Sequence, residues 1–446
     1  MKAICAALAL GLVLSAATPA IAQRPPEAER AEPALRTSFI RLSNGANAVL
    51  VEPVTLDPVK SRIAVLVAHP EHVNTFNYFI GRELPRYGYR VMMVNTYGPE
   101  RTYDEFTAPI AAAIKALRAL PGVEKVVMAG HSTGGPELTA YQDIAENGLK
   151  ACQGPERIYK CRMTSAADLP KADGVMLLDT NAGAPERTIA LNPAIGADPR
   201  RVDPRLDMFA PANGFDPATR GATYGAAFKT AYFAGQATRA DGLIDTALGR
   251  LALIEKGQGA YKDDEPFVVP GSDLHVNGAR LDLADLSVLS RTHAPHMVLK
   301  ADGSSPTEIV VRVGAPTAKP DDQDGLFETT LNVTVRHYLS FEALRLEPGY
   351  ALTASDIRGV QWRSTPNSAP GNMEGIRAPT LVMVATCAPH LIFGEIAFDR
   401  SPAADKSFVA VEGANHALMP CKPEYGDTTR RAFDFVDRWL SKPGRF

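Results

Sequence analysis

A serine flanked by glycines, in Gly130-His-Ser-Thr-Gly134, has the spacing G-x-S-x-G. An apolar stretch at residues 125–129 precedes it and a helical pattern at 137–146 follows it, so we expect Ser132 on a sharp turn from a buried strand into a helix. The glycines let strand and helix approach without Cβ clashes, and the turn holds the serine hydroxyl above the sheet. The pattern predicts that Ser132 is a nucleophile.

A serine hydroxyl is a weak nucleophile unless a base takes its proton, and His416 is the base we predict. It ends the segment Glu-Gly-Ala-Asn-His, after a predicted strand at 406–411 and before a predicted helix at about 425–440. A histidine in the loop after the last strand can reach a nucleophile at the same edge of the sheet. His131, beside the serine, is expected to pack beneath the turn. The histidines that lack a strand-then-loop placement are His275, His293, His296, His337 and His390.

The acid that should orient the histidine is harder to assign. The segment 386–390, after a predicted strand, reads Thr-Cys-Ala-Pro-His and contains no carboxylate. Asp179, at the end of the preceding buried strand, is the first candidate, Glu395 is the second and Asp399 is a third. A serine–histidine dyad and an acid from the inserted segment at 182–378 stay open as alternatives. Such an acid orients the imidazole and stabilises its charged form.

Two backbone N–H groups are expected to bind the oxyanion that forms when a serine attacks a carbonyl group. One belongs to Thr133, at the start of the predicted helix, and the other to Glu71, because the residue before it is a proline without an N–H. His69 and His72 have the spacing of some metal ligands, but no carboxylate or third histidine with supporting spacing accompanies them. We therefore expect neither a metal ion nor another cofactor.

The N-terminus has the layout of a cleavable secretory signal, with an apolar run from residue 3 to about 17 and Ala-Ile-Ala before Gln23. The run is short for a membrane span, no later stretch approaches about 20 uncharged apolar residues, and Cys5 lies too early for a lipid anchor. A soluble protein without a membrane anchor, periplasmic or secreted, is expected. The net charge of −3 and the lack of a lysine and arginine block give no reason to expect nucleic acid.

Four cysteines remain after removal of the signal, an even number in a chain exported to an oxidising compartment. Cys152 and Cys161 flank a short polar loop, Cys387 follows a predicted strand, and Cys421 lies just beyond the candidate base. Of the three possible pairings, we expect the local one, Cys152–Cys161 and Cys387–Cys421, with free thiols as the alternative. The lack of C-x-x-C spacing argues against a metal site.

Strands and helices must alternate to place these residues at one edge of a sheet. Continuous apolar runs are typical of strands buried on both faces, and their alternation with helices predicts a mostly parallel sheet. The predicted buried strands lie at 63–68, 90–95, 125–129, 172–179, 379–385 and 406–411, and the helical patterns between the first of them at 74–87, 103–120 and 137–146. A strand pair around Asn44-Gly45 comes first.

A long segment separates the fourth buried strand from the fifth. It combines a helical face at 243–254 with strand patterns at 297–299, 308–313 and 330–339, so we interpret it as a mixed α+β cap inserted before the last two strands of the sheet. The predicted organisation is a signal peptide at 1–22, a flexible lead-in at 23–37, a core at 38–181, the cap at 182–378 and the rest of the core at 379–446.

These motifs resemble the α/β-hydrolase superfamily, through a His-Pro turn after one strand, Gly130-His-Ser-Thr-Gly134 after another, and Gly413-Ala-Asn-His416 near the C-terminus. The resemblance covers about 38–179 and 379–440. It implies an α/β fold with an eight-stranded, mostly parallel sheet flanked by helices, and a Ser–acid–His triad in that chain order. Ser132 and His416 match the family pattern, whereas the usual acid position does not.

The resemblance also implies an activity and a partner. Ester hydrolysis is the commonest activity of this superfamily, and the extended cap resembles those that select substrates in exported esterases. We therefore expect cleavage of a small-molecule carboxylic ester through an acyl-enzyme on Ser132. An amidase or peptidase with the same nucleophile, and a binding protein that kept the fold without activity, are the alternatives. The oligomeric state is left open.

Overall fold

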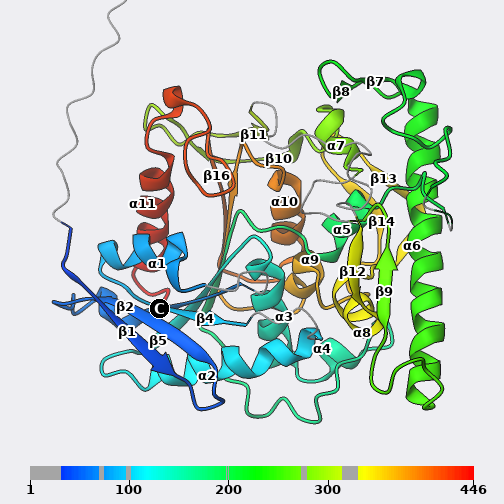
Figure 1. Ribbon diagram of the computed structural model, residues 1–446. Coiled ribbons are helices and arrows are strands. Elements are labelled where there is room, and N and C mark those ends of the chain that lie inside the picture. The colour runs from blue at the N-terminus through cyan, green and yellow to red at the C-terminus, as the bar shows by residue number, and fades with distance from the viewer. Residues whose placement is uncertain are drawn as a thin grey trace, which may run out of the picture.

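Ten strands form one sheet at the centre of the computed structural model, in the order β1-β2-β4-β3-β5-β6-β15-β16-β10-β11 (Figure 1). The structure describes residues 32–69, 75–96, 102–196, 198, 200–272, 279–313 and 330–446. From one edge of the sheet to the other, the strands are β1 (Leu35–Arg41), β2 (Asn47–Pro53), β4 (Arg90–Asn95), β3 (Ile63–His69), β5 (Lys125–His131), β6 (Gly174–Leu178), β15 (Thr380–Ala385), β16 (Lys406–Val411), β10 (Arg291–Leu299) and β11 (Thr307–Val311).

Most of the sheet is parallel. Every neighbouring pair from β4 to β10 is parallel, and the antiparallel pairs β1–β2, β2–β4 and β10–β11 lie at its two edges. β3 shows why an apolar run makes a central strand, because Val65 and Val67 pack on one face of the sheet while Ala64 and Leu66 pack on the other. A strand buried in this way needs helices on both sides.

Helices cover both faces of the sheet. Side chains of α2, α3 and α10 join the larger apolar cluster on one face, whereas those of α1 and α11 join the second cluster on the other face (Figure 1). The helices of this part are α1 (Phe79–Glu83), α2 (Thr107–Arg118), α3 (Gly134–Asn147), α4 (Lys150–Gln153), α10 (Leu391–Arg400) and α11 (Thr428–Leu440). With Ser132 at the carboxyl end of the central strand β5, this is an α/β-hydrolase fold, with ten strands instead of eight.

The segment between β6 and β15 is mixed α and β, and its longest element is the helix α6 at the right of Figure 1. Its helices are α5 (Ala184–Ala190), α6 (Ala226–Glu255), α7 (Leu281–Ala284), α8 (Val335–His337) and α9 (Ala369–Met373). Three two-stranded sheets accompany them: β7 (Phe215–Asp216) with β8 (Gly221–Ala222), β9 (Pro266–Val269) with β12 (Leu331–Thr334), and β13 (Leu346–Leu352) with β14 (Ile357–Val360).

Two strands of this segment lie in the main sheet, although the sequence placed them in the cap. β10 pairs in parallel with β16, with Met297 opposite Val409 and Leu299 opposite Val411, and β11 closes the edge. The register of β10 shifts between Arg291 and Pro295. A strand with a register shift and alternating exposed and buried residues is typical of the antiparallel edge of a sheet. The local sequence of β10 therefore does not identify β16 as its partner.

Two other elements also differ from the prediction. The helix predicted at 74–87 is three short pieces, η2 (Thr75–Asn77), α1 and η3 (Leu84–Tyr87), and Pro85 removes an N–H that a longer helix would use. The strand predicted at 330–339 ends at Thr334, whose side chain accepts a hydrogen bond from the His337 N–H and starts a helical turn. Further turns are η1 (Lys60–Arg62), η4 (Tyr103–Phe106), η5 (Pro211–Asn213), the π-turn η7 (Tyr338–Glu342) and η8 (Pro423–Tyr425).

Disulfides join Cys152 to Cys161 and Cys387 to Cys421, the pairs expected from the sequence, with Cα atoms 5.5 and 6.4 Å apart. The second one ties the turn after β15 to the loop after β16. The signal predicted at 1–22 lies outside the described residues. In the part of the chain that the structure describes, no helix has the length and apolar character needed to cross a bilayer.

Candidate active site

Ser132 lies on the turn from β5 into α3 and has a φ of 53°, a left-handed conformation that side-chain-bearing residues rarely adopt. Glycines allow the close packing around it. A Cβ on Gly130 would lie 2.6 Å from the Cα of Gly135, and a Cβ on Gly134 would collide with the carbonyl oxygen of Ala68 in β3. Strand, turn and helix can therefore meet only with glycine at these positions.

Asp179 follows the next strand of the sheet. β5 and β6 are parallel with His131 opposite Leu178, so Ser132 and Asp179 leave neighbouring strands side by side. Asp179 is fully buried, and its Oδ1 accepts a hydrogen bond of 2.9 Å from the N–H of Ala385 in β15. The register of three parallel strands thus fixes the place and direction of this carboxylate.

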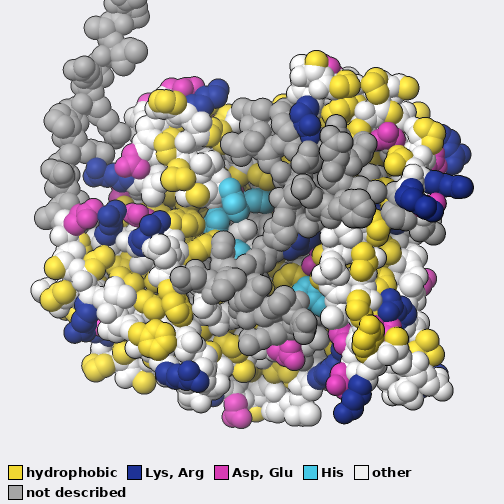
Figure 2. All heavy atoms as spheres, viewed as in Figure 1, with side chains coloured by type: hydrophobic (Ala, Val, Ile, Leu, Met, Phe, Trp, Pro, Cys, Tyr) yellow, Lys and Arg dark blue, Asp and Glu magenta, His cyan; other side chains and the backbone are white. Residues whose placement is uncertain are grey.

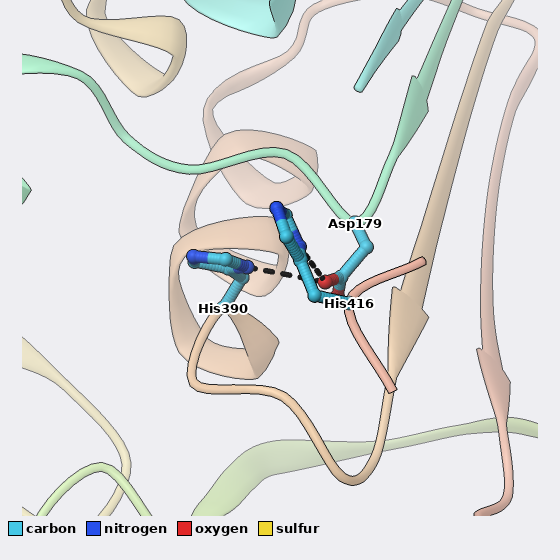
Figure 3. Close-up of side chains that lie close together, drawn as sticks. All are labelled: Asp179, His390 and His416. Atoms are coloured by element: carbon cyan, nitrogen blue, oxygen red, sulfur yellow. Dashed lines mark hydrogen bonds and ion pairs between the residues drawn. The ribbon is translucent and has the colours of Figure 1, made fainter. Parts of the chain in front are cut away.

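Two histidines meet the other oxygen of this carboxylate. Asp179 Oδ2 lies 2.7 Å from His416 Nδ1 and 3.1 Å from His390 Nδ1 (Figure 3). Since an ionised carboxylate only accepts hydrogen bonds, both rings donate through Nδ1. His416, in the loop after β16, therefore has Nε2 as its basic nitrogen, and its side chain is 39% exposed.

His131 links His416 to the turn that carries Ser132. Its ring stacks on that of His416, with centroids 4.3 Å apart, and its Nε2 donates to the His416 carbonyl oxygen at 2.6 Å. The Tyr78 hydroxyl lies 2.5 Å from the other ring nitrogen, Nδ1. Because His131 directly precedes Ser132, these contacts hold the His416 loop against the start of the turn that carries the serine.

Burial, and then the charge of His416, lower the pKa of His131 to about 3, so the ring is neutral in the fold. An unfolded histidine has a pKa near 6.5, so it is protonated at acidic pH values at which the folded His131 ring stays neutral. The stability from this residue is thus present above about pH 6.5 and is lost as the pH falls towards the folded pKa. We expect His131→Asn to reduce the loss of unfolding free energy between about pH 6.5 and 4 by about 3 kcal/mol. Urea unfolding at both pH values measures this, and an unchanged loss would contradict it.

His390 lies between two carboxylates. Its Nδ1 faces Asp179, its Nε2 lies 3.4 Å from Glu186 Oε1, and only 6% of the residue is exposed. Burial alone would lower the pKa of His390, but the charges of Glu186 and Asp179 outweigh it and raise that pKa to about 10. Burial would also raise the pKa of Asp179, yet the charge of His390 and the hydrogen bonds from both rings hold it well below its usual range.

Within the described ranges, one group of side chains has its potential ligand atoms within 4.8 Å of one another, as a metal ion would need: Asp179, His390 and His416. Both rings turn Nδ1 towards the carboxylate, so hydrogen bonds account for this arrangement. In the HxxH pair, His69 lies 3.1 Å from the Thr133 hydroxyl, and His72 is outside the described residues.

The structure separates the candidate acids. Glu395, on α10, accepts hydrogen bonds from His296 Nε2 at 2.8 Å and from the His293 N–H at 2.9 Å, and so ties α10 to β10. Asp399 lies 3.5 Å from the His293 ring. Of the three candidates, Asp179 is the one hydrogen-bonded to His416.

Of the two predicted oxyanion donors, Thr133 lies among the described residues. It is the N-cap residue of α3, so its backbone N–H lies at the positive end of the helix dipole, directly after Ser132. Glu71 lies outside the described residues. Figure 2 shows histidine side chains near the middle of one face of the molecule.

Sequence reasoning missed His390 and Glu186. His390 ends the segment after β15 in which a carboxylate was expected, and a titratable residue in that place was the available signal. Glu186 lies in α5, inside the inserted segment, where nothing in the local pattern distinguishes it from other carboxylates.

The disulfide Cys387–Cys421 closes a loop that contains His416. Its cysteines are 34 residues apart, against 9 for Cys152–Cys161, and loop-closure entropy grows with that separation. We expect removal of the longer bridge to cost about 4 kcal/mol of unfolding free energy and removal of the shorter one about 2.5 kcal/mol. Denaturant unfolding of the two double-alanine variants measures both, and a larger cost for the shorter bridge would contradict the prediction.

Comparisons with known proteins find only distant structural similarity. No family model and no curated protein matches the chain. A brefeldin A esterase, titled a bacterial homologue of human hormone-sensitive lipase, is 14% identical over 94% of this chain and 78% of its own, with a TM-score of 0.41. The esterase domain of a Rhodothermus marinus protein is 13% identical over 92% and 98%, with a TM-score of 0.37. Est1E from Butyrivibrio proteoclasticus is 10% identical over 91% and 96%, with a TM-score of 0.39. Likeness this distant does not bear on what the chain does.

Proposed function

We propose that this protein is a serine hydrolase that cleaves carboxylic esters through an acyl-enzyme on Ser132, with His416 as general base and Asp179 as the acid that orients it. The observation that carries the proposal is the 2.7 Å contact between Asp179 Oδ2 and His416 Nδ1, beside the strained turn of Ser132. A serine, an imidazole and a buried carboxylate from three loops at one edge of a sheet serve nucleophilic catalysis.

The proposed reaction assigns one role to each of these groups. His416 Nε2 takes the proton of Ser132 as the serine Oγ attacks the ester carbonyl carbon, and Asp179 stabilises the imidazolium that forms. The N–H groups of Thr133 and Glu71 donate to the oxyanion. His416 then protonates the leaving alkoxide, which leaves the acyl group on Ser132. Water, deprotonated by His416, releases the acid and restores the serine, and no step needs a cofactor.

The proposed enzyme acts outside the cytoplasm. Two disulfides support an oxidising compartment, in agreement with the signal predicted at 1–22. The substrate class is a small-molecule ester.

Labelling with a fluorophosphonate, followed by peptide mapping, tests the nucleophile. We expect one equivalent of label on Ser132, with loss of activity in proportion, and wild-type protein that stays unlabelled and inactive would contradict the proposal. Hydrolysis rates on a panel of esters with varied acyl length then show which sizes of acyl group the site accepts. Matched aryl ester and anilide substrates decide between esterase and amidase, because the triad serves both.

A further inference from the structure

The carboxylate at the centre of this site serves two histidines. His416 and His390 contact the same oxygen of Asp179, and their ring centroids lie 4.6 Å apart (Figure 3). His416 has a partly exposed side chain and stacks on His131 beside the serine turn, whereas His390 is buried behind the carboxylate. The mechanism proposed above uses only the first of them.

Buried groups of alternating charge continue from His390 into the inserted segment. Glu186 lies against His390 on one side and forms an ion pair with Arg280 on the other. Arg280 also pairs with Asp282 at 2.8 Å, and Asp282 lies 3.9 Å from Arg312. At most 8% of any of these residues is exposed. A neutral His390 would leave two buried carboxylates facing each other across an uncharged ring, which burial penalises.

We propose that His390 is a positioning residue that stays an imidazolium throughout turnover and holds Asp179 ionised and in place against His416. This inference rests on the proposed function. The charged and titratable groups that face His390 are Asp179, Glu186, His416 and, one step further, Arg280. A cation fixed against Asp179 favours the ionised carboxylate, which is the form that accepts a hydrogen bond from His416 Nδ1.

Steady-state kinetics on an activated ester test this role. In His390→Asn, we expect kcat to fall by about tenfold or more with little change in KM, because Asp179 loses the cation that holds it ionised beside His416. His390→Lys keeps a cation and should retain a kcat close to that of the wild type. An unchanged kcat per folded protein in His390→Asn, or equal losses in both variants, would overturn the proposal, because a merely structural role lowers stability without lowering kcat per folded protein.

A second measurement does not depend on activity or on a variant that folds poorly. In protein labelled with ¹⁵N-histidine, the ring signals of His390 should show both nitrogens protonated from about pH 6 to 8.5. A neutral His390 ring in that pH range would contradict the inference even if the enzyme is active. Conversely, if the wild type fails to react with fluorophosphonate while His390 is charged, it is the proposed function that fails.

Discussion

Replacing Ser132 with alanine is expected to lower kcat for ester hydrolysis by about 10⁴-fold or more, because the hydroxyl supplies the bond to the substrate carbonyl that no neighbouring group replaces. Alanine and serine meet the same backbone restriction at a φ of 53°, so the turn should keep its shape. The residual rate comes from the oxyanion donors and from substrate binding. Initial rates on an activated ester, with equal far-ultraviolet circular dichroism of the two proteins, measure the effect.

Ser165 provides a matched control for this substitution. It is exposed, and its Oγ accepts a hydrogen bond from the Ala167 N–H in a surface turn. Ser165→Ala should therefore keep kcat/KM within about twofold of the wild type, as surface substitutions usually do. A Ser132→Ala protein that still hydrolyses the ester at the rate of this control would remove the serine mechanism altogether.

The central strands could be predicted because each carries its own signal. A run such as 63–68 is apolar on both faces wherever it lies, and the glycines around Ser132 are required by a turn whose residues are all local. β10 carries no such signal, since its place beside β16 depends on a pairing with a distant segment. Local patterns thus predict buried elements well and edge partners poorly.

The assignment of the acid residue shows the same limit of prediction from local sequence patterns. Asp179 ends one predicted strand, whereas Glu395 lies beyond the end of the next, so the sequence ranks Asp179 first but leaves Glu395 open. The choice follows from register, because His131 lies opposite Leu178 and places Asp179 next to the serine turn. Glu395 instead faces β10, a strand that the sequence analysis placed in the cap.

The contrast between these two carboxylates leads to the second large expected effect. Asp179→Asn should lower kcat by about 10⁴-fold with little change in KM, because an amide neither stabilises the His416 imidazolium nor enforces the tautomer with Nε2 as the basic nitrogen. Asp179 is fully buried against both histidines, and asparagine has nearly its shape, so the loss reports on charge and tautomer more than on packing.

Glu395→Gln is the matched control, since it makes the same change of acid to amide in a buried side chain that contacts His293 and His296 but not His416. We expect kcat per folded protein within about threefold of the wild type, although the melting temperature should fall as α10 loses an ionic tie to β10. Steady-state kinetics on both variants decide the assignment. Equal losses in the two, or a larger loss in Glu395→Gln, would mean that Asp179 does not orient the base, because only a carboxylate hydrogen-bonded to His416 can act on its tautomer.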